Sequence, residues 1–534
     1  MLPKQLRFLH PYLHATGLLL MVVGLPFSML LMSLSQFFIG GNWILEGDYV
    51  NKWKRFRSNK TALLLTGLFL IYLPTVIWSS NVDESLKMLR INLPLLIFPF
   101  VMGSTNPLPT SWYYVLIRVF IAAVFLAVVT CSIIGLPQWI NGSLNDIRHI
   151  SLFISHIRFA LLIVLAVFLA IWILIYRPFE VGRTERMAYL LAIGGLLAFM
   201  VVLQSLNGFA VLFAIGLCWL FVEVKRKLRP LWFNVLTGTL FIVFLLIAGI
   251  LFKTWSDYFT PAEKFSFPLP SLTQVGKPYS HDLDLIENGS YIGSFVCEPE
   301  LRSEWPKLSK TAIDSFDLKG HPILITLIRY LNSKGLTKDS LGVHSLTGDD
   351  IQNIEKGMAN FKYAGLWGLR MRYYQLMYEY AFYASGGENA SGHTLLMKLE
   401  FWKAGVKIAS DNPLLGVGIG DVPDEFSAYY KKTNSWLSND WRLTCHNQYL
   451  YMAVAGGFLT LILFLVIFFF VLKISWNRTI LPFKLFIGII LVAMLTEDML
   501  TTQAGVSLVA FFLSLFVFGN FTFETSHEAS NSLG

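Results

Sequence analysis

One histidine of this chain stands directly before a long apolar run. His446 begins the sequence His446-Asn447-Gln448-Tyr449-Leu450, which opens the mostly apolar segment Gln448–Leu472. The unperturbed pKa of an imidazole, ~6.5, suits a general base that works near neutral pH. A histidine at this position can equally cap or anchor a helix at a membrane surface. The residues alone leave both interpretations open.

A pair of carboxylates, Glu497-Asp498, ends another apolar segment, Leu481–Thr496. Paired carboxylates at the edge of the hydrocarbon layer are costly unless they are paired or line a cavity. We therefore expect them to hold an arginine in place or to bind substrate hydroxyls. The alternative is an ordinary solvated loop.

Basic side chains gather before and at the start of a third apolar segment, in Ile147-Arg148-His149 and Ser155-His156-Ile157-Arg158. Arg158 either extends its charged end to the membrane surface or binds an anion. Arginine suits phosphate groups because its planar guanidinium donates two hydrogen bonds at once.

The glycine-rich stretch from Asn412 to Asp421 reads Asn-Pro-Leu-Leu-Gly-Val-Gly-Ile-Gly-Asp. A helix is expected before it, whereas a dinucleotide-binding loop follows a strand, so we reject nucleotide binding. The glycines more simply allow a tight turn and a close approach of two backbones. No group of residues has the spacing of metal ligands, so neither a metal nor a cofactor is expected. A disulfide between Cys297 and Cys445 is left open, because sequence does not show proximity.

The composition of the chain indicates which kind of helix positions these residues. The chain is 55% hydrophobic and only 14% charged, against roughly 25% charged in an average soluble protein. This excludes a disordered chain, a fibrous repeat and a small disulfide scaffold, and argues strongly against a soluble enzyme. A helix needs ~20 mostly apolar residues to cross a bilayer. The clear candidates are Thr61–Ser79, Trp112–Gly135, Arg158–Tyr176, Met187–Gln204, Gly208–Val224, Leu231–Phe252, Gln448–Leu472, Leu481–Thr496 and Val506–Phe521.

Two further apolar regions complete an all-α polytopic membrane protein of about 12 transmembrane helices. Ile91–Met102 is shorter and contains two prolines, and Ala15–Glu46 is predicted to form two short or broken helices. Lys and Arg in the short loops favour cytoplasmic termini and place residues 253–445 outside. That region is nearly neutral, so the net charge of +8 belongs to the basic loops of the apolar part and indicates no nucleic-acid binding.

The expected organisation is therefore an N-terminal transmembrane part, residues 1–252, and a large external loop domain, 253–445. C-terminal transmembrane helices, 446–521, and a cytoplasmic tail, 522–534, follow. The loop domain is predicted to be mostly helical, with helices over His321–Lys334, from Thr347 to Glu355 and over Leu396–Ala409. Residues 253–320 are rich in Pro, Ser and Asp, which favours irregular structure.

Residues 412–459 resemble the signature of the O-antigen ligase and polymerase superfamily. The resemblance lies in the glycine-rich stretch, in His446-Asn-Gln-Tyr-Leu and in Gly456-Gly-Phe-Leu459. The predicted topology, a dozen spans with one large periplasmic loop before the last few, is also similar. The resemblance implies a bacterial cytoplasmic (inner) membrane enzyme that is metal-independent and inverts the sugar. Its donor would be a glycan linked to undecaprenyl diphosphate, and its acceptor a sugar hydroxyl of lipid A-core or of another glycan.

By the same resemblance His446 is the general base, with Asn447, Glu497 and Asp498 in support. Ser205-Leu206-Asn207-Gly208 stands where the family often has Ser-Arg-Gly. Lysine stands before Trp402 where the family tends to have arginine. The basic residues expected to bind the diphosphate are Arg158, Lys398, Arg370, Arg372 and Arg442.

Three alternatives remain beside an O-antigen ligase. A polysaccharide polymerase of the same superfamily shares these motifs. A transporter or lipid-glycan flippase would more commonly show internal repeats and charged residues in mid-membrane, and we find neither in the sequence. A non-catalytic scaffold for envelope assembly would not need His446.

Overall fold

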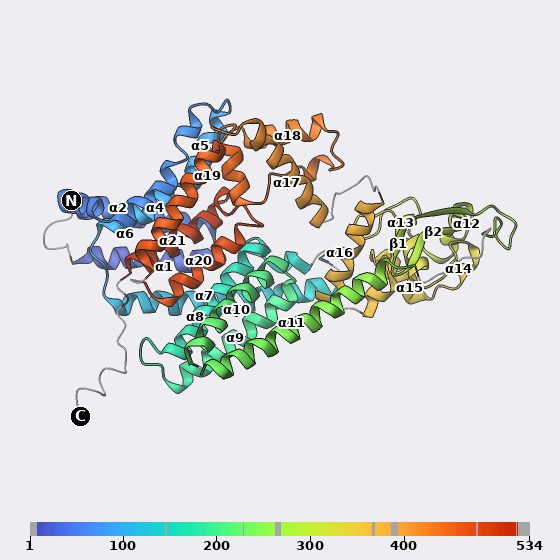
Figure 1. Ribbon diagram of the computed structural model, residues 1–534, viewed down its shortest axis with the longest axis horizontal. Coiled ribbons are helices and arrows are strands. Elements are labelled where there is room, and N and C mark those ends of the chain that lie inside the picture. The colour runs from blue at the N-terminus through green and yellow to red at the C-terminus, as the bar shows by residue number, and fades with distance from the viewer. Residues whose placement is uncertain are drawn as a thin grey trace. The chain divides into compact units, whose positions relative to one another are not determined.

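The computed structural model describes residues 8–141, 143–144, 147–227, 229–261, 269–365, 369–385, 394–476, 479–519 and 521. The chain is mostly helical, as predicted, with one two-stranded sheet among these residues (Figure 1). It divides into two compact units. The first unit comprises Met1–Val222, Lys398–Ser435 and Asn439–Gly534, and the second comprises Glu223–Met397 and Trp436–Ser438.

Eight helices of the described residues are long and apolar enough to cross a membrane, or nine if a bent pair counts as one span. The bent pair is α3 (Tyr49–Ser58) and α4 (Lys60–Leu70). α20 (Leu481–Ala493) and α21 (Gln503–Phe518) are shorter, so the count of 12 stays a prediction. The eight are α1 (Leu9–Phe27), α5 with α6 (Val82–Asn92, Pro94–Ser104), α7 (Thr110–Ile140), α8 (His156–Tyr176), α9 (Arg183–Leu203), α10 (Leu206–Lys227), α11 (Pro230–Phe259) and α19 (Gln448–Ser475).

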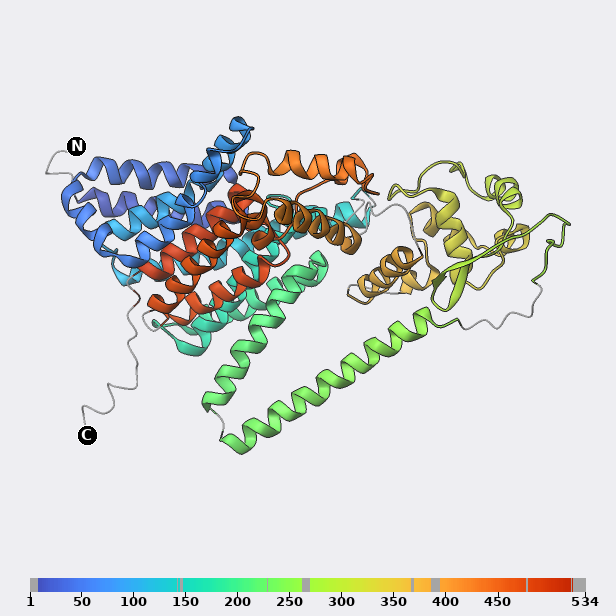
Figure 2. The same ribbon diagram turned by 45° about the horizontal axis from the view of Figure 1, so that its top comes forward.

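The first apolar region is broken into two helices, as predicted. α1 ends at Phe27 and α2 (Met29–Glu46) begins after Ser28, whose backbone is extended at φ −159° and ψ 121°. Ser28 Oγ accepts a hydrogen bond from the backbone N–H of Leu31 at 3.4 Å and so caps α2. Helices from both ends of the chain pack together in the first unit, α21 against α6 and α19 against α4 (Figures 1 and 2).

The glycine-rich stretch, Asn412–Asp421, forms a loop that we call the clasp loop. It follows α17 (Thr394–Asp411) and packs against a break in α19, where Gly456 and Gly457 leave helical geometry. The N–H groups of Val417 and Gly418 donate to the carbonyls of Val454 (2.9 Å) and Ala455 (3.0 Å). The N–H of Phe458 donates to the carbonyl of Pro413 at 2.8 Å. Unpaired backbone groups are very costly in an apolar setting, so the clasp loop replaces the bonds that the break removes.

The predicted close approach of two backbones is confirmed at this crossing. Gly416 and Gly418 have positive φ (64° and 95°). A Cβ atom at Gly416 would lie 2.4 Å from the carbonyl oxygen of Val454, and one at Gly457 would lie 2.2 Å from that of Leu414. Only glycine fits at positions 416 and 457.

Asp421 ties the end of the clasp loop to the start of α5. Its carboxylate accepts hydrogen bonds from Ser79 Oγ (3.0 Å) and from the N–H groups of Ser80 and Asn81 (both 2.7 Å). Asn81 in turn caps α5 by accepting from the N–H of Glu84 at 3.1 Å. The clasp loop therefore fixes α17, α19 and α5 to one another, and α18 (Val422–Lys432) follows it.

We expect Gly457→Ala to destabilise the protein strongly. Gly457 has φ +70° and ψ −178°, a region that costs a side-chain-bearing residue about 1–3 kcal/mol, and the clash with Leu414 adds to this. Thermal unfolding of the purified variant in detergent measures the effect. Gly194→Ala, on α9 with nothing within 4 Å of the new Cβ, is the control and is expected to be neutral or slightly stabilising. Equal unfolding temperatures for the two variants would contradict this role of the clasp loop.

The second unit contains a β-hairpin that the prediction of irregular structure over residues 253–320 missed, so that prediction is wrong. β1 (Ser280–Glu287) pairs antiparallel with β2 (Ser290–Val296), and both turn residues, Asn288 and Gly289, have positive φ. Asn-Gly between alternating apolar residues is a hairpin signal that the sequence did contain. Besides α11 and the short helix η4 (Phe361–Gly365), this unit contains α12 (Glu298–Leu308), α13 (Ile323–Ser333), α14 (Ser340–His344), α15 (Gly348–Glu355) and α16 (Leu369–Ala384).

Two of those helices confirm predictions made from local signals. α13 lies within His321–Lys334, and Gly335 follows it with φ +70°. α15 begins after Thr347, which forms a capping box with Asp350. Cys297 and Cys445 are both buried free thiols.

Candidate active site

The start of α19 and the turn after α20 are joined by hydrogen bonds. The N–H of Gln448 donates to the carbonyl of Met494 at 2.9 Å, and Asn447 Nδ2 donates to the carbonyl of Leu495 at 2.9 Å. Gln448 Oε1 accepts from the N–H of Leu500, in the short helix η6 (Met499–Thr501), at 2.7 Å. Asn447 also caps α19 by accepting from the N–H of Leu450 at 3.0 Å. These bonds bring His446 beside Glu497 and Asp498.

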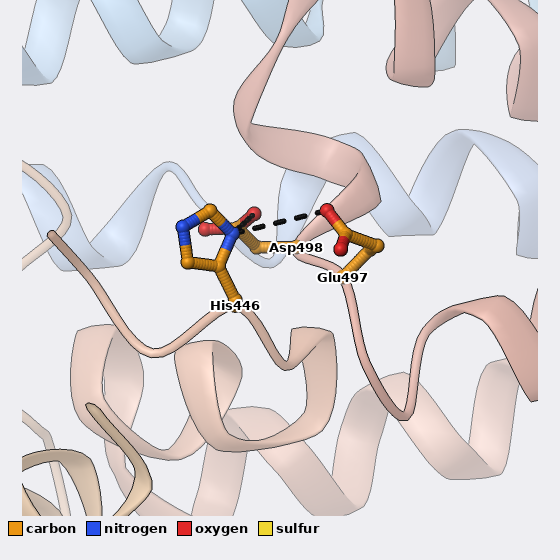
Figure 3. Close-up of side chains that lie close together, drawn as sticks. All are labelled: His446, Glu497 and Asp498. Carbon is orange, nitrogen blue, oxygen red and sulfur yellow. Dashed lines mark ion pairs between the residues drawn. The ribbon is translucent and has the colours of Figure 1, made fainter. Parts of the chain in front are cut away.

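His446 forms ion pairs with both carboxylates through one ring nitrogen (Figure 3). Its Nδ1 lies 3.5 Å from Asp498 Oδ1 and 3.8 Å from Glu497 Oε2. The two acidic residues are only 3–4% exposed, so the alternative of a solvated loop is wrong. The histidine side chain is 29% exposed. Within the described part of the chain its Nε2 has no partner, which leaves this nitrogen for a bound molecule.

The backbone of His446 is strained. Its φ of +43° lies in the left-handed region, which is uncommon and costly for a residue other than glycine. Such strain persists only where surrounding contacts impose it. Here the capped start of α19 and the two ion pairs supply those contacts, and the Phe401 ring of α17 lies 5.5 Å from the imidazole between ring centres.

The two carboxylates change the protonation of His446. Burial alone lowers the pKa of its imidazole, but the opposite charges of Asp498 and Glu497 outweigh burial and raise that pKa to about 9. Burial raises the pKa of Asp498, but its pairing with His446 outweighs this and keeps the carboxyl pKa below its ordinary value. Near neutral pH the site therefore holds an imidazolium and a carboxylate.

Lys398, near the start of α17, completes the cluster. Its Nζ lies 3.6 Å from Glu497 Oε1 and donates to the carbonyl of Thr496 at 3.1 Å. Thr444 Oγ1 donates to Asp498 Oδ2 at 3.1 Å. The carboxylates thus hold a lysine and a histidine rather than the arginine that we expected, and neither Thr444 nor Phe401 was found from the sequence.

One ligand atom each from His446, Glu497 and Asp498 lies within 4.8 Å of the others, close enough to hold a metal ion. The members of this group come from two separate segments of the chain, so the absence of metal-ligand spacing in the sequence did not exclude it. A metal would have to displace the Lys398 ammonium from Glu497 and the proton from His446. A metal-independent site therefore stays our expectation.

The printed contacts of the other predicted anion-binding residues do not include this cluster. Arg158, at the start of α8, donates from Nη1 to Ser155 Oγ at 3.0 Å. Arg442 follows the short helix η5 (Asn439–Trp441), and its N–H donates to the carbonyl of Asn439. Arg370 and Arg372 belong to α16 of the second unit, where Arg372 donates to Gln375. Among the described residues of the first unit, Lys398 is the one predicted cation that contacts this cluster.

An apolar groove of about 350 Å³ begins beside the site. Asn447, the residue after His446, is part of its lining, Trp402 and Val406 contribute from α17, and Ala453 and Phe458 contribute from α19. The residues around it are mostly hydrophobic, so the groove suits a hydrocarbon chain.

Comparison with known families matches residues 368–465 to the model of the O-antigen ligase family. Comparison with curated proteins finds no match. The matched range contains α17, the clasp loop, His446 and the first part of α19, and it confirms the resemblance found in the sequence.

Proposed function

We propose, from the O-antigen ligase family domain that this chain carries, that it transfers a glycan from undecaprenyl diphosphate to a sugar hydroxyl of lipid A-core. The enzymes of this family transfer lipid-linked glycans. The proposed location is the periplasmic face of the bacterial cytoplasmic membrane. The observation that carries the proposal is a histidine held by two buried carboxylates beside an apolar groove.

In the proposed reaction, Nε2 of neutral His446 takes the proton of the acceptor hydroxyl while its oxygen attacks the anomeric carbon. The bond from that carbon to the diphosphate oxygen breaks on the opposite face, its electrons leave with the diphosphate, and the sugar is inverted. Asp498 and Glu497 stabilise the imidazolium that forms. Because the imidazole pKa is raised to about 9, the neutral form is a minority near pH 7 and grows as the pH rises.

The leaving diphosphate gains negative charge, which fixed cations in a poorly solvated site stabilise strongly. Lys398 is the best-supported cation because it already lies at the cluster. Arg158, Arg370, Arg372 and Arg442 remain proposed contributors. The apolar groove between α17 and α19 offers a place for the lipid portion of the donor.

Deleting the gene tests the ligase assignment. We expect lipid A-core without long glycan, together with accumulated polymer on undecaprenyl diphosphate, because assembly continues while transfer stops. Gel analysis of lipopolysaccharide and mass spectrometry of the lipid extract measure both, and re-expression of the wild-type chain is the control. Chains of single-repeat length on lipid A-core would instead indicate a polymerase, and an unchanged pattern would contradict both.

Purified enzyme should stay active in EDTA. A loss of activity that only a divalent metal restores would overturn the metal-independent mechanism.

A further inference from the structure

Helix α3 makes a right angle with the helix that follows it. The bend between Tyr49–Ser58 and Lys60–Val76 is 90°, and Asn59 caps the second helix by accepting from the N–H of Ala62 at 3.1 Å. If α4 runs across the bilayer, α3 therefore runs along its surface.

Two cations of α3 are used to attach it to the helix bundle. Lys52, 1% exposed, reaches Glu46 Oε2 and the carbonyl of Trp43, both at 2.7 Å. Arg55 Nε donates to the carbonyl of Ser104, the last residue of α6, at 2.7 Å. These contacts fix which face of α3 points outward.

The outward face combines apolar and basic side chains. Tyr49, Val50 and Trp53 are 44%, 69% and 55% exposed. Lys54 and Arg57 are exposed on the same helix, and Lys60 follows the bend. These three cations have no hydrogen-bond or ion-pair partner within the residues that the structure describes.

We propose that α3 lies in the plane of the membrane surface and binds anionic phospholipid headgroups through Lys54, Arg57 and Lys60. Aromatic rings favour the boundary between headgroups and hydrocarbon, and a helix with an apolar and a basic side suits such a boundary. The charged residues of α3 itself are all basic, and the acidic residues before it, Glu46 and Asp48, pair with Lys52 and Arg55. An anionic surface therefore complements the exposed side. The loop bearing α3 is also on the side that the Lys/Arg distribution assigns to the cytoplasm. The proposal is independent of the transferase function.

The test compares the full-length chain in lipid nanodiscs of phosphatidylcholine with and without phosphatidylglycerol. Native mass spectrometry measures how many phosphatidylglycerol molecules stay bound and how strongly. We expect K54Q/R57Q/K60Q to weaken binding by about fivefold for each cation removed. Inorganic phosphate added to the phosphatidylcholine discs is expected to leave no such bound species.

The matched control removes three other exposed cations, R183Q/K225Q/R229Q, and is expected to retain most of the binding. Equal losses in the two triple variants would overturn a specific role for α3, as would unchanged binding in K54Q/R57Q/K60Q. Because all these side chains are exposed, both variants should fold, and unfolding temperatures in phosphatidylcholine discs verify this.

Discussion

Replacing His446 with alanine is expected to lower glycan transfer by about 10²–10⁴-fold, the range that a positioned general base contributes. The imidazole is the proposed base of the reaction, and its removal leaves the acceptor hydroxyl without a proton acceptor. Turnover of the purified variant in proteoliposomes with a lipid-linked donor measures the loss. The lipid and acceptor sites remain, so the KM for the donor should change little.

Two further variants keep this prediction open to refutation. His446→Gln can still donate to Asp498 but does not accept a proton as a base, so it should be as inactive as the alanine variant. His344→Ala removes an exposed histidine of the second unit and should keep full activity. Activity of His446→Gln near the wild-type level would exclude the general-base role.

Asp498→Asn is expected to move the pH dependence of transfer. In the wild-type enzyme the rate rises as His446 loses its proton, with half of the maximum near pH 9, because the carboxylates raise its pKa to about 9. Removing one carboxylate lowers that pKa toward the ordinary ~6.5, so the rising limb moves to lower pH. The maximal rate falls as well, because the imidazolium formed in the reaction loses its closest counter-charge.

A rate–pH profile for each enzyme measures this shift, and a displacement of at least about one unit is expected. Asp424→Asn, on the exposed part of α18, should leave the rising limb in place. A profile unmoved by Asp498→Asn would show that another group controls the rate.

The pairing of His446 with the carboxylates also predicts an effect on fold stability. Because the pKa of folded His446 lies above its unfolded value, the ion pair stabilises the fold fully below about pH 6.5 and is lost as the pH rises through about 9.

Local signals in the sequence were sufficient for much of the fold. Pro26 within Ala15–Glu46 is typical of a helix break, the capping residues of Thr347–Asp350 predict a helix start, and the glycines of the clasp loop indicate a close backbone approach. Each signal acts within a few residues. The Asn288-Gly289 turn belongs to the same class, and the compositional argument for an irregular region obscured it.

The site required tertiary information. Nothing local pairs His446 with Asp498, because the bonds that join them run between the start of α19 and the turn after α20. The resemblance identified the histidine, and its pairing with the negative charges of Asp498 and Glu497 then explains its raised pKa. Lys398 was one of five basic candidates until its distance to Glu497 separated it from the others.

The clasp loop limits how this chain can be recombined with its relatives. The carbonyls of Val454 and Ala455 obtain their partners from a segment on the other side of His446. A chimaera whose junction falls between Asn412 and Phe458 would join a broken helix to a loop that was not selected to fit it. A chimaera made to change the acceptor preference should therefore have both of its junctions outside this interval.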